Sequence, residues 1–159
     1  MKTLLLMRHA KSEWTDRSMS DHDRPINERG RAAAPAMAAW MRDQDLEPEE
    51  VMCSSATRAH QTAQLVCEHL GIAINSVHRS LYLPSVDDMI GELVMAKGDR
   101  VLMVSHNPAC EVFAERITGE LKSMPTAAVA VIDFDIECWS DVVLSPRASL
   151  RMRQRPKAL

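Results

Sequence analysis

The sequence predicts an α/β fold of three layers, in which helices cover both faces of a mainly parallel central sheet. Along the 159 residues, short apolar runs typical of buried strands alternate with segments whose apolar residues recur at helical spacing. Helices that connect successive strands in this way leave the strands parallel and cover the sheet on both faces. No internal repeat or Pro/Gly-rich linker divides the chain, so its length fits one domain.

The same patterns place the individual elements. Five segments are short and apolar enough to be strands: residues 3–7, 51–53, 76–78, 101–104 and 127–134. A further apolar run, 142–144, is expected to form a last strand at the edge of the sheet. Four helices are expected between the strands: one after the N-cap Asn27, one capped by Ser54 or Ser55 and ended by Gly71, one at 86–96, and one begun by Asn107-Pro108 and ended near Gly119.

The C-terminal segment differs from the rest of the chain in charge. The net charge is −3, yet residues 147–157 contain five basic residues and no acidic one. We therefore expect a domain at residues 1–146 and a basic tail at 147–159. A basic tail can contact nucleic acid or an acidic partner. Chain termini are commonly poorly ordered, so a solvated, frayed end is the preferred interpretation and no nucleic-acid partner is expected.

The composition argues against several other classes of protein. No apolar run is long enough to span a bilayer, and the run from Leu4 to Met7 is too short for the core of a signal peptide. The four cysteines show neither CxxC spacing nor a zinc-finger arrangement with histidines, and we expect them to be reduced, small apolar residues. The expectation is a cytoplasmic protein without a membrane segment, with a monomer favoured.

Polar residues of one chemical kind follow three of the predicted strands. Arg8 and His9 follow the first strand, Arg58 lies in the first turn of the helix after the second, and His106 follows 101–104. In open α/β sheets, ligands bind beyond the carboxyl ends of parallel strands, which meet at one edge. We therefore expect two arginines and two histidines to converge on one crevice, beside helix N-termini that favour anions.

This combination suits a phosphoryl group. Arginine binds phosphate oxygens through a bidentate fork, and phosphoryl transfer depends mainly on positioning and positive charge. A histidine nucleophile has to be neutral, and Arg8, Arg58 and a charged His106 are expected to lower the pKa of His9 and keep its ring neutral. A metal site on His9 and His106 is not expected, because the arginines repel cations and no third ligand is apparent.

These motifs resemble the histidine phosphatase superfamily, whose fold is called phosphoglycerate mutase-like. The resemblance rests on Arg8-His9-Ala10, Arg58 and Ser105-His106-Asn107. The short length, residues 23–30 and Met124-Pro125-Thr126 are similar to the small bacterial branch of that family, the SixA-type phosphohistidine phosphatases. The likeness extends from Met1 to about Phe134.

The resemblance implies a role for each matching residue. His9 would be the nucleophile that forms a phosphohistidine intermediate, and His106 would donate a hydrogen bond to the transferring group. Arg8 and Arg58 would bind the phosphoryl oxygens. Two further phosphate contacts are expected, the Ser12 hydroxyl and the backbone N–H of Asn107. No metal or organic cofactor is implied.

Two departures from the family pattern bear on the substrate. Ala10 stands where relatives usually have glycine after the Arg-His pair. The chain also lacks a glutamate near residues 81–83, where many relatives carry the acid that protonates an alcohol leaving group. Asp87, Asp88 and Glu92 are the remaining candidates for such an acid. A phosphohistidine substrate has less need of one, since transfer between two imidazoles is close to even in energy.

The favoured function is therefore removal of the phosphoryl group from a phosphohistidine-bearing carrier protein. The interval 71–100 is too short for a lid, and an open site admits a side chain of another protein. The alternative partner is a small phosphate ester, hydrolysed by a phosphomonoesterase of the same fold. A mutase is less favoured because it needs a closed pocket. A non-catalytic phosphate-binding module is the alternative from another class, and the complete Arg-His-Arg-His set argues against it.

Overall fold

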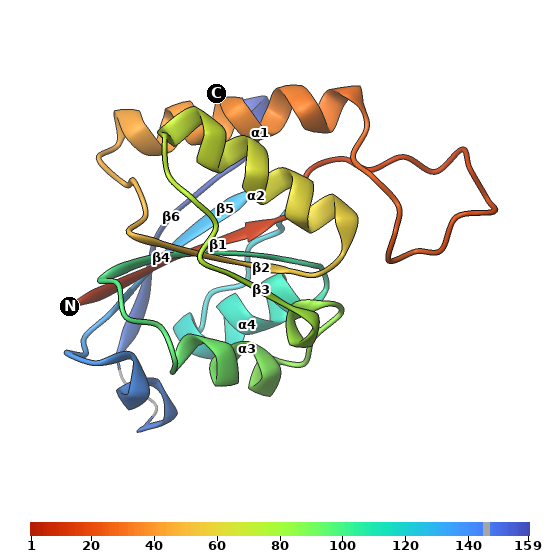
Figure 1. Cartoon of the computed structure of the whole chain (residues 1–159). Helices are drawn as coiled ribbons and strands as arrows, with labels where there is room; N and C mark the ends of the chain where they lie inside the picture. The colour runs from red at the N-terminus through yellow and green to blue at the C-terminus, as the bar shows by residue number, and fades with distance from the viewer. Residues whose placement is uncertain (145–146) are drawn as a thin grey trace.

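The computed structural model describes residues 1–144 and 147–159, and its centre is a six-stranded sheet in the order β3-β2-β4-β1-β5-β6 (Figure 1). The strands are β1 (Lys2–Arg8), β2 (Glu50–Ser54), β3 (Ser76–His78), β4 (Arg100–Ser105), β5 (Val129–Phe134) and β6 (Ala148–Gln154). The pairs among the first four are parallel, whereas β5 is antiparallel to both β1 and β6. The mainly parallel sheet is confirmed.

Helices cover both faces of this sheet (Figure 1). The helices α1 (Glu28–Asp43) and α2 (Thr57–Leu70) lie on one face, and α3 (Val86–Leu93) and α4 (Ala109–Thr118) lie on the other. Along β1, Leu5 and Met7 join the core cluster that contains α1 and α2 residues, while Leu4 and Leu6 join the one that contains α3 and α4 residues. Strands covered on both faces read as continuous apolar runs, which explains the predicted pattern.

The starts of α1 and α2 differ in how they are capped. The side chain of Asn27 accepts a hydrogen bond from the third N–H of α1, so the predicted cap is confirmed. The predicted cap of α2 is wrong, because its N-cap is Ala56, which makes no side-chain hydrogen bond, and neither Ser54 nor Ser55 serves in that place. Gly71 ends α2 with a φ of 69°, a left-handed conformation that favours glycine.

The helix α3 starts at Val86 as predicted but ends early, and the start of α4 differs from expectation. A capping box between Ser85 and Asp88 begins α3, which ends before the predicted residue 96. The helix α4 begins at Ala109, and Asn107 does not cap it. The Asn107 amide instead donates a hydrogen bond of 2.9 Å to the carbonyl oxygen of Met124, and this ties the turn after β4 to the approach of β5.

The C-terminal part departs most from the sequence prediction. The expected strand at 142–144 is wrong, because these residues belong to a 3-10 helix, η2 (Trp139–Leu144). The frayed end is also wrong for residues 148–154, which form β6. There the Arg151 guanidinium bonds both carboxylate oxygens of Asp133 on β5, at 2.7 and 2.8 Å. The predicted end of the domain at residue 146 lies outside the described residues.

Two short 3-10 helices complete the described structure, η1 (Arg79–Leu81) after β3 and η3 (Pro156–Ala158) after β6. Among the described residues, no helix combines the length and apolar character needed to cross a bilayer. The four cysteines are free thiols, three of them buried and Cys138 exposed.

Candidate active site

The polar residues that follow β1, β2 and β4 meet in one cavity of about 360 Å³. The carboxyl ends of these strands lie at the end of the molecule from which the loop between β1 and α1 projects (Figure 1). All six residues predicted from the sequence line the cavity: Arg8, His9, Ser12, Arg58, His106 and Asn107. The other lining residues are Lys11, Trp14, Asp21, Arg24, Leu83 and Thr126.

Hydrogen bonds fix the tautomer of the His9 ring. His9 is 7% exposed, and its backbone N–H donates to the carbonyl oxygen of Ser105 at 3.0 Å. Its Nδ1 lies 2.8 Å from the carbonyl oxygen of Ala10, which can only accept, so Nδ1 carries the hydrogen. In a neutral ring the lone pair then belongs to Nε2. Consistent with this, Nε2 accepts a hydrogen bond of 3.3 Å from Nε of Arg58.

The environment of His9 keeps its ring neutral. Burial lowers its pKa, and the positive charges of Arg58, Arg8 and Arg24 lower it further. The hydrogen bond to the Ala10 carbonyl opposes these effects in part, and the pKa falls to about 4. The arginines thus act in the expected direction, but loss of hydration is the larger cause.

His106 is neutral too, which corrects the expectation that its charge helps to depress the pKa of His9. Burial is the main cause, and nearby His9 and Arg58 add to it, so the pKa of His106 falls to about 3. The two rings lie with their centroids 5.2 Å apart. The Nε2 atom of His106 lies 2.8 Å from the Ser54 hydroxyl oxygen, while its buried Nδ1 has no hydrogen-bond partner among the described residues.

Arg58 is held in place by the loop between β1 and α1. It lies in the first turn of α2 and is only 3% exposed. Its Nη1 donates to the backbone carbonyl of Asp21 at 2.7 Å, and its Nη2 pairs with the Asp21 carboxylate at 3.0 Å. Together with the bond to His9, these contacts fix the plane of the guanidinium beside Nε2 of His9.

Several donors at the cavity are buried but unused. Arg8, the last residue of β1, donates through Nη1 to the Met124 carbonyl at 3.1 Å, while its Nε has no partner. Within the described part of the chain, six buried side-chain N or O atoms lack a partner, and four of them belong to residues that line this cavity: Arg8 Nε, Arg24 Nε, His106 Nδ1 and Asn107 Oδ1. Three of these four are nitrogens, and together with the lining cations Lys11 and Arg58 they make this a region that suits an anion with several acceptor oxygens.

Asp21 and Arg24 belong to the cavity, although sequence reasoning did not select them. Asp21 pairs with Arg24 at 3.1 Å as well as with Arg58. The Arg24 guanidinium also bonds the Ser12 hydroxyl oxygen and lies 3.4 Å from the centre of the Trp14 ring. Ser12 therefore accepts from Arg24 and keeps its own hydrogen for another acceptor. These residues lie in the loop, where no periodic pattern marks them.

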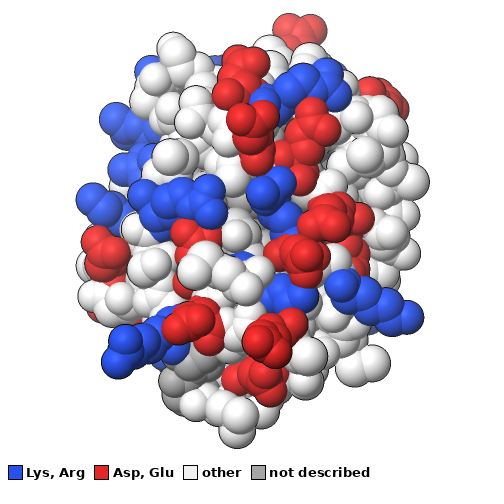
Figure 2. Space-filling model, turned by 90° about the vertical axis from the view of Figure 1, so that its left-hand side faces the viewer, with Lys and Arg blue, Asp and Glu red and all other residues white. Residues whose placement is uncertain are grey.

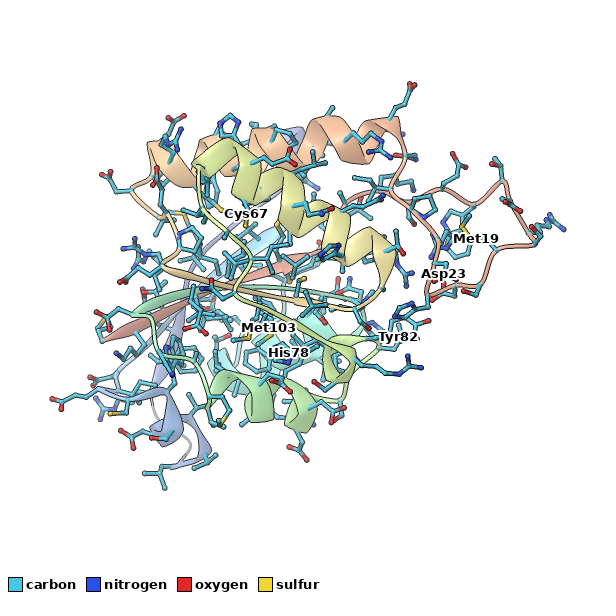
Figure 3. The ribbon with its side chains drawn as sticks, in the orientation of Figure 1. Met19, Asp23, Cys67, His78, Tyr82 and Met103 are labelled. Atoms are coloured by element: carbon cyan, nitrogen blue, oxygen red, sulfur yellow. The ribbon has the colours of Figure 1, made fainter. Side chains whose placement is uncertain are left out.

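Tyr82 closes the same network from the other side. It lies at the same end of the molecule as the loop that carries Met19 and Asp23 (Figure 3). Its hydroxyl donates to the Asp21 carboxylate at 2.6 Å. Burial by itself would raise the pKa of Asp21, but the hydrogen bonds from Tyr82 and Arg24 and the charge of Arg58 outweigh it and hold the pKa below its usual range. Asp21 is therefore a carboxylate at neutral pH.

None of the three candidate general acids lines the cavity. Asp88 is used in the capping box of α3, and Glu92 bonds Ser80 and lies 3.0 Å from the ring of His78. Asp87 lies in the first turn of the same helix. In the described residues, Asp21 is the one carboxylate that lines the cavity.

Comparison with known proteins identifies the class to which this fold and site belong. The sequence profile described as the histidine phosphatase superfamily (branch 1) matches residues 4–79, which include Arg8, His9 and Arg58. An uncharacterised protein of Mycobacterium tuberculosis is 31% identical over 153 residues, covering 86% of this chain and 91% of that protein. The chain therefore belongs to the histidine phosphatase superfamily, in its SixA-type group.

The solved structures that indicate this group match nearly the whole chain. A putative phosphohistidine phosphatase SixA from Nakamurella multipartitia has a TM-score of 0.84 and 27% identity, covering 98% of this chain and 96% of that one. A putative phosphohistidine phosphatase SixA from Agrobacterium tumefaciens has a TM-score of 0.83 and 26% identity, covering 98% of each chain. A mycobacterial glucosyl-3-phosphoglycerate phosphatase, at 16% identity over 96% of this chain and 98% of that one, shares the fold with a TM-score of 0.73. The α/β, phosphoglycerate mutase-like fold is confirmed.

Proposed function

We propose that this protein removes the phosphoryl group from phosphohistidine on another protein, with His9 as the nucleophile. The observation that carries the proposal is the state of the His9 ring. The Ala10 carbonyl holds its Nδ1–H, and the lone pair on Nε2 lies beside Arg58 at a cavity lined by cations. Attack on phosphorus requires such a lone pair. Relatives with the same fold that are described as putative phosphohistidine phosphatases support the substrate class.

In the first step, Nε2 of His9 attacks phosphorus and the P–N bond of the substrate breaks. A new P–N bond forms at Nε2, and the electron pair of the broken bond stays on the substrate imidazole. That ring departs as neutral imidazole when its other nitrogen already carries a proton. The Arg58 N–H that bonded Nε2 is then free to bond a phosphoryl oxygen.

The unused donors of the cavity stabilise the charge on the phosphoryl oxygens. Arg8 and Arg24 each offer a buried Nε–H. His106 offers Nδ1–H when the Ser54 hydroxyl donates to its Nε2, and that tautomer leaves both ring nitrogens satisfied once phosphate is bound. In the second step, water attacks phosphorus, inorganic phosphate leaves, and the lone pair returns to Nε2 of His9.

The acid chemistry of the cavity favours an imidazole over an alkoxide as leaving group. An alkoxide needs a proton donor. Among the described lining residues the one carboxylic group is Asp21, whose low pKa keeps it ionised. The proposal includes four further points. The partner is a phosphorylated protein, the location is cytoplasmic, the protein is a monomer, and the reaction needs no metal or organic cofactor.

The test compares phosphate release from a carrier protein phosphorylated on histidine with release from para-nitrophenyl phosphate. We expect release from the carrier, loss of that release in His9→Ala, and an acid-labile phosphoryl group on His9 by mass spectrometry. His69→Ala is the matched control, since His69 is exposed at the end of α2 and outside the cavity.

Two outcomes would contradict the proposal in different ways. Release from the carrier by His9→Ala at the wild-type rate would reject His9 as nucleophile. Efficient turnover of the small ester without turnover of the carrier would assign the site to a small-molecule phosphomonoesterase.

A further inference from the structure

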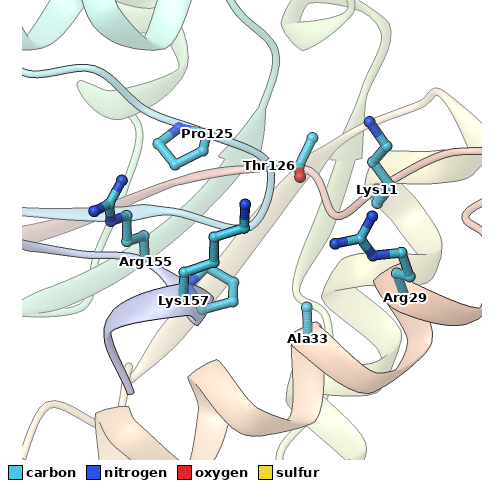
Figure 4. Close-up of a pocket in the computed structure, with 8 residues that line it drawn as sticks. Lys11, Arg29, Ala33, Pro125, Thr126, Arg155 and Lys157 are labelled. Carbon is cyan, nitrogen blue, oxygen red and sulfur yellow. The ribbon is translucent and has the colours of Figure 1, made fainter.

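A second pocket, of about 320 Å³, lies beside the candidate active site. Figure 4 shows that distant parts of the chain form it: Lys11 follows β1, Arg29 belongs to α1, Thr126 precedes β5, and Arg155 and Lys157 come from the end of the chain. We call this the four-cation pocket, after Lys11, Arg29, Arg155 and Lys157.

The charges of the four-cation pocket are not balanced by the protein. All four side chains belong to exposed residues, and no carboxylate is among the described residues that line the pocket. None of the four forms an ion pair with a described residue, whereas exposed Arg42 pairs with Glu47 at 2.6 Å. Like charges held together in a concave surface create a field that attracts anions.

The face of the molecule where β1 begins does not share this character. Figure 2 shows the face on the left of Figure 1, where β1 begins, and acidic and basic side chains alternate across it. The chain as a whole carries a net charge of −3. The four-cation pocket therefore marks a local site for an anionic ligand and not a generally basic protein.

The four-cation pocket adjoins the candidate active site. Lys11 and Thr126 line both cavities. The Lys11 backbone is fixed by α1, since its carbonyl accepts the Asn27 N–H at 2.9 Å and the absence of a side chain at Gly30 allows the helix to approach it. A substrate protein that places its phosphoryl group at His9 therefore has the second pocket next to its reacting group.

We propose that the four-cation pocket binds an acidic segment of the substrate protein, close to its phosphohistidine. The proposal rests on the phosphohistidine function proposed above. Carboxylates match the forked donors of Arg29 and Arg155, and the rings of Pro125 and Pro156 offer apolar contact for the methylene groups of an acidic side chain. Specificity for the substrate protein then comes from charge complementarity outside the reacting centre.

The test is the double variant Arg155→Gln/Lys157→Gln, which removes two exposed cations of the pocket. Two substrates are compared: a histidine-phosphorylated protein with acidic residues near the phosphohistidine, and phosphoramidate, a small compound with a P–N bond. We expect the ratio of kcat/KM for the protein to kcat/KM for phosphoramidate to fall by roughly tenfold, mainly through KM. The control is Lys122→Gln/Arg147→Gln, which removes two exposed cations outside the pocket and leaves the ratio unchanged.

A direct binding measurement distinguishes an acidic peptide from inorganic phosphate as the ligand of the four-cation pocket. A fluorescent acidic peptide without phosphohistidine is expected to bind the wild type, to bind the Arg155→Gln/Lys157→Gln variant more weakly, and to lose affinity as salt rises. An unchanged ratio in the double variant overturns the proposal, and so does a pocket that binds inorganic phosphate but not the peptide. Failure of the proposed function would look different, because the wild type would then release no phosphate from the phosphorylated protein.

Discussion

Two ionisable residues of the site, His9 and Asp21, respond to burial in different ways. For His9, burial and the surrounding arginines act together and leave the ring neutral, with a pKa of about 4. For Asp21, burial is opposed by Tyr82, Arg24 and Arg58, and the carboxylate stays charged. The proposed nucleophile is therefore neutral, and Asp21, which holds the neighbouring Arg58, is charged.

The low pKa of His9 makes stability depend on pH. Its pKa is about 4 in the folded protein against an ordinary value of 6.5, so below pH 6.5 the unfolded chain binds more protons than the folded one. The contribution of His9 to stability is fully present above about pH 6.5 and is lost as the pH falls towards about 4, and His106, with a pKa of about 3, adds a contribution of the same sign. We expect His9→Asn to flatten this loss, measured as the urea midpoint between about pH 7 and about pH 5. His69→Asn should keep the wild-type slope, and an equally steep loss in both variants would reject the assignment.

The contacts of Asp21 predict a large effect of its replacement. Asp21→Asn removes the charge that pairs with Arg58 and Arg24, so the guanidinium beside His9 loses its anchor. We expect kcat/KM to fall about 10- to 100-fold, which corresponds to roughly 1–3 kcal/mol. Asp23→Asn is the matched control, because this exposed carboxylate pairs with neither Arg58 nor Arg24, and the one side chain within ion-pair distance of it in the described residues is the His22 ring, at 3.5 Å. Equal activity of the two variants would show that Asp21 does not position Arg58.

At the scale of elements, sequence patterns predict helices and strands whose apolar residues recur at a regular spacing. They do not predict elements whose position depends on contacts with distant parts of the chain. The runs at 3–7 and 101–104 predict strands because both faces of each strand are buried. The strand β6 was not predicted, although Leu150 and Met152 alternate with Arg151 and Arg153 as in a half-buried strand, because the basic charge and terminal position of this segment favoured a frayed end. Leu150 and Met152 are partly buried against the two core clusters. These contacts come from distant segments, so a local sequence pattern does not reveal them.

The site was predictable to the extent that its residues follow strands. Arg8, His9, Arg58 and His106 could be selected because strand ends have a known position in a parallel sheet. Asp21 and Arg24 could not, because a loop has no periodicity and their importance arises from contacts with α2 and with each other. Tyr82 likewise reaches Asp21 only through the tertiary fold.

Two glycines in helices are expected to respond to alanine with opposite signs. In α3, a Cβ on Gly91 would meet nothing, and Gly91→Ala should stabilise by about 0.5–1 kcal/mol through helix propensity. In α1, a Cβ on Gly30 would collide with the backbone carbonyl of Lys11, so Gly30→Ala should destabilise. Urea unfolding measures both, and a stabilising Gly30→Ala would show that α1 can move away from Lys11.

The role of β6 can be tested by truncation. A chain that ends at Gln154 keeps β6, whereas one that ends at Arg147 loses its pairing with β5 and the contacts of Arg151 with Asp133. We expect the longer chain to unfold close to the wild-type midpoint and the shorter one to be strongly destabilised and prone to associate, since an unpaired strand edge is exposed. Similar midpoints for the two truncations would support a tail that contributes nothing to the fold.

On the scale of the whole molecule, the site is assembled from most of the chain. Its residues range from Arg8 to Thr126 and come from the end of β1, the loop between β1 and α1, the first turn of α2, and the segments that precede α3, α4 and β5. The four-cation pocket adds the last residues of the chain to the same end of the sheet. Both cavities therefore depend on the complete fold and are expected to be lost together when the protein unfolds.

This dependence predicts that inorganic phosphate stabilises the folded protein. A ligand that binds only the folded state adds about 2.7 kcal/mol at about 100 times its Kd. We expect the Tm to rise with phosphate concentration, and to rise less in Arg58→Ala, measured by thermal unfolding at constant ionic strength. A Tm that responds equally to phosphate in both proteins would place the binding elsewhere.

The unused donors of the cavity have a consequence for regulation. In the proposed reaction, the donors of Arg8, Arg24 and His106 that would bind the phosphoryl group would also bind the phosphate ion that remains after hydrolysis, because both groups present the same oxygens. The reaction product then competes with the next substrate for one site. Turnover would slow as phosphate accumulates, which makes the enzyme responsive to the phosphate status of its surroundings without a separate regulatory site.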